Sequence, residues 1–195
     1  MKRTLILTIS FVLITMLTAC GGCGGSNTKS KQNILIAYFS YSGNTKSVAE
    51  HLQSLIGGDL FEIKTSDPYP QDRDAVLAQG RKEFDDNFKP ALANHLNDID
   101  KYDIVFIGFP IWFSSTPMAI LSFLETHNLS NKTIVPFSTR GGGEIGQSVA
   151  VIKAASPNSV VLDGFHDINR ANFDQAQKLT EEWVKGPGKN IISRK

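Results

Sequence analysis

The chain has 195 residues, of which 41% are hydrophobic, and its formal net charge at neutral pH is +1. This length suits one domain with additional segments, and the hydrophobic content is sufficient for a buried core. The near-neutral charge argues against a nucleic-acid-binding protein, which would carry a basic stripe. We expect no nucleic-acid partner, and we assign no metal site.

Residues 1–19 have the pattern of a secretory signal peptide. A short basic start precedes an apolar run over residues 5–17, and the run ends at a small residue followed by Cys20. This ending resembles the lipobox of bacterial lipoproteins, and the resemblance implies that Cys20 becomes the lipid-bearing N-terminus. The alternative is an uncleaved membrane helix, but the apolar run is shorter than the roughly 20 residues that a span needs.

Residues 20–32 are predicted to form a flexible tether, since Gly, Ser, Asn, Lys and Gln dominate them without apolar periodicity. A coil of this length reaches roughly 20 Å, which would keep the domain close to the bilayer. We therefore expect a lipid-anchored protein on the extracytoplasmic side of the cell membrane or the outer membrane. Cys23 has no partner once Cys20 is acylated, and we interpret it as an incidental free thiol.

Strand and helix patterns alternate from residue 33 to residue 186, and residues 187–195 are predicted to be a tail. The alternation predicts an α/β doubly wound domain, with a five-stranded parallel sheet between two layers of helices. The helix over residues 72–87 is expected to direct Val76, Leu77, Phe84 and Phe88 inward. Strands are expected at 33–39, 60–63, 103–108, 133–138 and from 160, and helices at 44–56, 72–87, 117–126, 145–155 and 172–184. Ligands of such sheets bind beyond the carboxyl ends of the strands, so the loops after the first, third and fourth strands are the informative ones.

The first loop can hold a phosphate group. Its residues are Ser40, Tyr41, Ser42, Gly43, Asn44 and Thr45. They combine hydroxyl and amide donors with a glycine turn and the positive end of a helix dipole. The loop contains no Lys or Arg, so neutral donors and the dipole would hold the phosphate. The alternative is that the Ser and Asn side chains only cap the helix.

The second loop carries large aromatic residues at a surface position. It contains Pro110, Ile111, Trp112 and Phe113, and a flat aromatic side chain there can stack on a flat ligand. The alternative is that Trp112 covers the edge of the core.

The third loop combines glycines with a cation. It contains Ser138, Thr139, Arg140, Gly141, Gly142 and Gly143. Consecutive glycines let the backbone approach a ligand closely and present several N–H groups. The alternative is a loop without a ligand and with a solvated Arg140.

Taken together, the three loops make residues 33 to about 184 resemble the FMN-binding flavodoxin family. The resemblance implies the strand order 2-1-3-4-5. It also implies that the loop from Ser40 to Thr45 takes the FMN phosphate, that Trp112 flanks the isoalloxazine ring, and that the backbone of 138–143 meets the pyrimidine edge. Phe113 stands where related sequences often carry a second Trp, and Arg140 stands where they often carry a small hydroxyl residue.

By this resemblance the protein is an FMN-dependent oxidoreductase or electron carrier. The near-neutral charge gives little long-range steering toward a charged protein partner, which favours a small acceptor such as a quinone. Arg140 is expected to raise the reduction potential of the flavin, or else to grip an anionic substrate. His166 is a weaker candidate at the flavin edge. The alternative function is a lipid-anchored binding module, without redox activity, for another phosphorylated ligand or for a protein partner.

Overall fold

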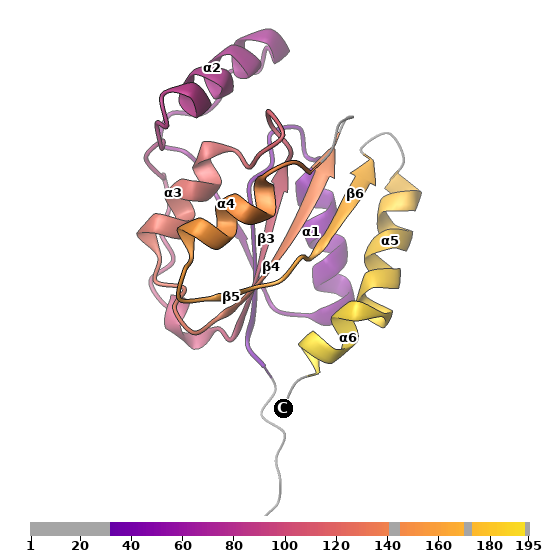
Figure 1. Ribbon diagram of the computed structural model, residues 1–195. Coiled ribbons are helices and arrows are strands. Elements are labelled where there is room, and N and C mark those ends of the chain that lie inside the picture. The colour runs from indigo at the N-terminus through magenta and orange to yellow at the C-terminus, as the bar shows by residue number, and fades with distance from the viewer. Residues whose placement is uncertain (1–31, 141–144, 170–172, 194–195) are drawn as a thin grey trace, which may run out of the picture.

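In the computed structural model, a parallel sheet runs through the domain between two layers of helices (Figure 1). The structure describes residues 32–140, 145–169 and 173–193. The sheet has the order β2-β1-β3-β4-β5, as predicted, and neighbouring strands in the described residues are parallel. The strands are β1 (Ile34–Tyr38), β2 (Asp59–Glu62), β3 (Ile104–Pro110), β4 (Thr133–Arg140), β5 (Val160–Val161) and β6 (Phe165–Asn169).

The fifth position of the sheet is shared by two short strands, so the sheet has six strands rather than the predicted five. β5 pairs with the start of β4, and β6 pairs with its second half. The break lies beside Pro136, which has no N–H to donate to a neighbouring strand. Gly164 passes this point with a φ of +69°, and a Cβ on it would lie 1.8 Å from the carbonyl oxygen of Pro136. Only glycine fits so close an approach.

Five of the helices flank the sheet. Figure 1 shows α3 and α4 on one face, and α1, α5 and α6 on the other. The helices are α1 (Asn44–Ile56), α2 (Arg73–Asp85), α3 (Met118–Thr126), α4 (Ser148–Ala155), α5 (Phe173–Lys185) and α6 (Pro187–Ile192). Within the described ranges, none of them is both long enough and apolar enough to cross a membrane.

The predicted tail is partly helical. Residues 187–192 form α6, in which Pro187 occupies the first helical turn and Gly188 is buried. A Cβ on Gly188 would lie 2.4 Å from the ring of Trp183, so the small residue lets α6 fold back against α5. Ile191 and Ile192 are partly buried against the core. This helix therefore belongs to the domain.

The core divides into two clusters, one on each face of the sheet. Leu35 and Ala37 on β1 belong to the cluster under α3 and α4. Ile34, Ile36 and Tyr38 on the same strand belong to the cluster under α1 and α5. Strands buried on both faces read as continuous apolar runs, which is why β1 and β3 were visible in the sequence.

Helix α2 lies apart from both layers, beyond the carboxyl ends of the strands (Figure 1). Its predicted inward face is only partly correct. Val76 is buried, but Phe84 and Phe88 keep 38% and 58% of their surface exposed. The other buried residues of the helix are Gly80 and Glu83. A helix with so few buried apolar side chains does not cover the face of a sheet, and this places α2 beside the candidate site instead.

Candidate functional site

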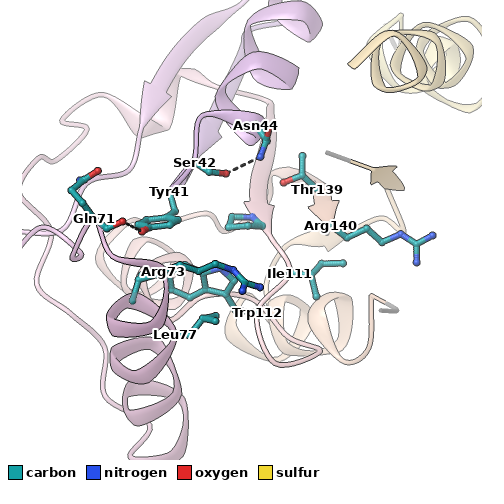
Figure 2. Close-up of a pocket in the computed structure, with 12 residues that line it drawn as sticks. Tyr41, Ser42, Asn44, Gln71, Arg73, Leu77, Ile111, Trp112, Thr139 and Arg140 are labelled. Carbon is teal, nitrogen blue, oxygen red and sulfur yellow. Dashed lines mark hydrogen bonds between the residues drawn. The ribbon is translucent and has the colours of Figure 1, made fainter. Parts of the chain in front are cut away.

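A cavity of about 540 Å³ lies at the carboxyl edge of the sheet, next to the ends of β1, β3 and β4 (Figure 2). Its volume lies within the range of small-molecule sites. The strand order reverses between β1 and β3 at this edge, where doubly wound proteins bind their ligands. The lining residues come from the three predicted loops and from α2 with the turn before it: Tyr41, Ser42, Asn44, Gln71, Arg73, Val76, Leu77, Pro110, Ile111, Trp112, Thr139 and Arg140.

The first loop leads into α1 through Gly43, which has a φ of +85° and has no side-chain cap. Asn44 donates its Nδ2 to the Ser42 Oγ at 2.7 Å, and both residues line the cavity. The Ser40 Oγ accepts the N–H of Lys46 at 3.2 Å. The capping alternative therefore holds for Ser40 but not for Asn44. The N–H of Lys46 is thus already bonded, whereas the N–H groups of Asn44 and Thr45 have no acceptor within the helix and are left for a ligand.

Thr45 does not line the cavity but fixes its geometry. Its Oγ1 lies 2.9 Å from the Oγ1 of Thr139, and both side chains are buried. This hydroxyl pair joins the first turn of α1 to the end of β4. The phosphate loop and the third loop are thus held in one arrangement by a contact between residues that are 94 positions apart.

The second loop is a tight turn in which Trp112 and Ser115 exchange backbone hydrogen bonds of 3.0 and 2.8 Å. The two central residues, Phe113 and Ser114, have φ values of 51° and 55°. Two adjacent positive φ angles define a type I′ turn, a conformation that favours Asn and Gly. Non-glycine residues in this conformation carry backbone strain, and such strain is found most often at functional sites.

Trp112 packs on the edge of the core and also borders the cavity. Its ring meets the rings of Phe39 and Tyr69 edge-on, with centroid separations of 5.6 and 5.3 Å. It also lines the cavity. The residue therefore covers the edge of the core and at the same time forms part of the cavity lining, so the sequence alternative of core cover holds and stacking on a ligand stays a prediction.

Phe113 packs outside the cavity, contrary to the prediction. Its ring lies 6.2 Å from the ring of Phe84, and the guanidinium of Arg81 lies 5.5 Å from its centroid. The positive φ of Phe113 turns its side chain away from that of Trp112 and toward α2. It connects α2 to the loop and is not among the residues that line the cavity.

The residues of the third loop are divided between the cavity and the neighbouring strand. Thr139 and Arg140 line the cavity, whereas Ser138 is fully buried with its Oγ 3.0 Å from the Nδ1 of His166 on β6. His166 thus supports the sheet at this point and does not line the cavity. Gly141, Gly142 and Gly143 lie outside the described residues.

Arg140 contributes its stem to the lining, but in Figure 2 its guanidinium extends away from the other lining residues. In this conformation it does not face a ligand in the cavity. The structure therefore lends no support to the expected effect of Arg140 on a flavin.

One wall of the cavity was not predicted from the sequence, and it is formed by Gln71, Arg73, Val76 and Leu77. The Tyr41 hydroxyl donates to the Gln71 carbonyl oxygen at 2.8 Å, which ties this wall to the phosphate loop. Gly80 packs on Trp112, because a Cβ there would lie 3.0 Å from the indole ring. The available signal was the sparse apolar pattern of residues 73–85, which is too weak for a helix on a sheet face.

A buried carboxylate fixes the far end of this wall. Glu83 accepts hydrogen bonds from the Tyr69 hydroxyl at 2.6 Å and from Gln79 at 2.9 Å. Burial, and next the hydrogen bond to Glu83, raise the pKa of Tyr69 far above its usual value. Tyr69 therefore stays protonated and remains a donor. Its ring also packs against Trp112, so one tyrosine connects the carboxylate, the helix and the floor of the cavity.

The strand order and the position of the cavity define a doubly wound α/β protein of the flavodoxin-like class. The chain belongs to the flavodoxin family, since the model for that family, described as Flavodoxin, matches residues 33–186. A search of the curated proteins found no match.

Solved structures agree with this assignment. A Bacteroides eggerthii protein assigned as a flavoprotein has 34% sequence identity and a TM-score of 0.69, over 84% of this chain and 99% of its own. A similarly assigned protein from Bacteroides uniformis has 27% identity and a TM-score of 0.67, over 79% and 98%. A Lactobacillus acidophilus flavoprotein in complex with FMN has 24% identity and a TM-score of 0.63, over 74% and 97%. Because its identity to this chain is only 24%, the similarity to the L. acidophilus protein shows a shared fold and no more.

Proposed function

We propose that this protein binds FMN at the carboxyl edge and acts as an oxidoreductase or electron carrier. The observation that carries the proposal is the convergence of the phosphate loop, the Trp112 turn and the end of β4 on one cavity of about 540 Å³. The L. acidophilus relative in complex with FMN supports the choice of cofactor. FMN, when bound, would supply hydride and single-electron chemistry.

The donors present fit a phosphorylated planar cofactor. Ser42, Asn44 and the first N–H groups of α1 would hold the phosphate, since a helix N-terminus favours an anion. Trp112 would lie against the ring, and Thr139 would donate or accept at its edge. Among the described lining residues there is no Asp or Glu that would repel the phosphate.

The proposed lipid anchor at Cys20 would leave the cavity open to the aqueous phase. The domain begins at β1, whose first residue, Ile34, lies at the amino edge of the sheet, opposite the cavity. An anchor on that side would direct the cavity away from the bilayer. A water-soluble acceptor, such as a polar quinone, suits this geometry better than one dissolved in the membrane.

Cofactor binding is tested by titrating the purified full-length protein, extracted in detergent, with FMN and with riboflavin. We expect flavin absorbance in the protein and an affinity for FMN at least about tenfold above that for riboflavin, because only FMN carries the phosphate. Asn44→Asp should remove most of this preference by placing a carboxylate at the phosphate site. A colourless protein that gives no heat with FMN would refute the proposal and favour the binding module.

The anchor is tested separately by labelling cells with a radioactive fatty acid. The wild-type protein should incorporate label and sediment with membranes, whereas Cys20→Ser should do neither. Label in the Cys20→Ser variant would rule out this residue as the lipid attachment point.

A further inference from the structure

The two ends of the cavity differ in charge and in composition. Ser42 and Asn44 lie at one end, and Figure 2 shows Arg73, Leu77 and Trp112 well separated from them at the other. The first end offers neutral donors and a helix N-terminus. The second offers an arginine, an aliphatic side chain and an indole. A cofactor phosphate at the first end would leave the arginine at the second end without an anion.

Arg73 has no ion pair or hydrogen bond within the described residues and is exposed on the first turn of α2. Both neighbours of Arg73 in the sequence are acidic, but neither forms an ion pair with it. Asp72 is the N-cap of the helix and accepts the N–H of Ala75 at 2.8 Å, and Asp74 is exposed in the first helical turn. No Asp or Glu appears among the described lining residues. The guanidinium is therefore available to a bound molecule, and its planar fork of donors matches a carboxylate or a sulfonate.

The helix that carries Arg73 is held in place by contacts at several points. The Tyr41 hydroxyl bonds to the Gln71 carbonyl oxygen at its start, and Tyr69 bonds to Glu83 near its end. Between them Gly80 rests on the ring of Trp112. These three contacts fix the position of α2 and hold Arg73 beside the cavity.

Resting on the proposed function, we infer that Arg73 selects a planar acceptor that carries a carboxylate or sulfonate. The acceptor would lie next to the bound flavin at the Trp112 end, with its anionic group on Arg73. For a quinone, the acceptor takes two electrons and two protons from the reduced flavin and leaves as the hydroquinone. This half-reaction balances, because oxidised flavin would be its other product; a separate electron donor would have to reduce the flavin before the next turnover.

The experiment measures acceptor binding without turnover. Oxidised, FMN-loaded protein is titrated with anthraquinone-2-sulfonate and with neutral 2-(hydroxymethyl)anthraquinone, and the change in flavin absorbance gives each Kd. Arg73→Gln should weaken binding of the sulfonate about tenfold and change the neutral Kd less than about twofold, because only the sulfonate forms a charge-assisted pair. Arg73→Lys should recover part of the loss.

Lys82→Gln serves as the matched control, since it removes one positive charge from the same helix at an exposed position outside the cavity. It should leave both anthraquinone affinities unchanged. The FMN affinity of each variant is measured by calorimetry and should stay within about twofold of wild type.

Any one of the following results would overturn the inference. If Arg73→Gln weakens the binding of both anthraquinones equally, Arg73 does not recognise the sulfonate group. If it weakens the binding of neither, Arg73 does not contribute to acceptor binding. A tenfold weaker FMN affinity with an unchanged preference between the anthraquinones would assign Arg73 to the cofactor. If the wild-type protein takes up no FMN, the proposed function fails and the inference fails with it. If it takes up FMN but shows no preference for the sulfonate, only the inference fails.

Discussion

Helices α1 and α2 both border the cavity, but they are attached to the domain in different ways. α1 lies against the sheet, with Val48, Ala49 and Leu52 fully or almost fully buried. α2 stands beyond the strands and buries only Val76, Gly80 and Glu83. One wall is thus part of the core, and the other rests on aromatic contacts and a few hydrogen bonds. The firmly attached wall at α1 fits the proposed binding of FMN, which must stay bound. The more weakly attached wall at α2 fits the proposed binding of an acceptor, which enters and leaves in each turnover.

The difference predicts that substitutions under α2 loosen one wall and leave the other intact. Stability and local opening can vary separately within a domain, because elements with few buried contacts open at lower free energy. Hydrogen exchange of residues 73–85 and 44–56 therefore provides a readout for each of the following predictions, beside the free energy of unfolding.

Trp112→Ala should have the largest effect. The side chain packs edge-on against Phe39 and Tyr69 and supports Gly80 of α2. Because the residue is half-buried, we expect a loss of about 2–4 kcal/mol in urea unfolding, toward the lower end of Trp→Ala substitutions in cores. Exchange should accelerate across α2 and remain unchanged in α1. Trp112→Phe, which keeps an aromatic ring, should lose clearly less, and equal losses in the two variants would contradict this account.

Tyr69→Phe should come next. It removes the hydroxyl that donates to the buried Glu83 carboxylate at 2.6 Å. Hydrogen bonds to charged groups contribute about 1.5–3 kcal/mol, and a buried carboxylate that loses a donor keeps its cost of desolvation. Urea unfolding should show a loss in that range, with faster exchange in α2.

Tyr41→Phe provides the matched comparison for Tyr69→Phe. It also removes one tyrosine hydroxyl, but the lost hydrogen bond is exposed and goes to a neutral carbonyl oxygen. We expect a loss below about 1 kcal/mol. Similar losses in the two Tyr→Phe variants would mean that Glu83 does not anchor α2.

Thr45→Val tests the other wall. It leaves the hydroxyl of Thr139 buried without its partner at 2.9 Å, at a cost of about 1–2 kcal/mol. The double variant Thr45→Val/Thr139→Val should be less destabilised than the sum of the single variants, since both unmatched hydroxyls are gone. Exchange should rise at the start of α1 and not in α2. Strict additivity in this double-mutant cycle would show that the two hydroxyls do not interact.

Much of this architecture follows from local pattern. β1 and β3 are apolar runs, and the rule that ligands bind beyond the carboxyl ends of parallel strands placed three loops at one edge. The split between β5 and β6 was hidden, because it depends on Pro136 of the neighbouring strand and on a close approach at Gly164. Such effects between strands leave no periodic signal in the segment that they interrupt.

The site was less predictable than the fold for a similar reason. From the sequence, Phe113 was expected to be a second aromatic residue at the ligand. The direction of its side chain depends on a positive φ that is unusual for phenylalanine. Arg73 lies in a helix whose apolar pattern is too sparse to show which surface it covers. Its place in the cavity depends on the Tyr69–Glu83 bond and on Gly80 against Trp112, all of which are contacts between distant or weakly patterned residues.

Acidification should produce the smallest effect, on the segment that follows α2. The Leu96 N–H donates to the His127 Nε2 at 3.1 Å, so the neutral ring carries its proton on Nδ1, 2.9 Å from the Phe123 carbonyl oxygen. Burial lowers the pKa of His127, and nearby His95 lowers it further, although the bond to Phe123 opposes the shift. The unfolded chain therefore binds a proton more readily than the folded one. The contribution of His127 is complete above its usual pKa of about 6.5 and is lost as the pH falls from there toward the folded pKa.

The measurement is the free energy of unfolding in urea from pH 7.5 to 5.5, compared between wild type and His127→Gln. The variant should be less stable at pH 7.5 but should lose less stability on acidification, because it has no imidazole at this position to titrate. The protection factor of the Leu96 amide, which is corrected for the slower intrinsic exchange in acid, should fall on acidification in the wild type, since a protonated ring can no longer accept its hydrogen bond. Parallel pH profiles in the two proteins would show that His127 is not the group responsible. Faster exchange confined to α1 would contradict the assignment of the weaker attachment to the α2 side.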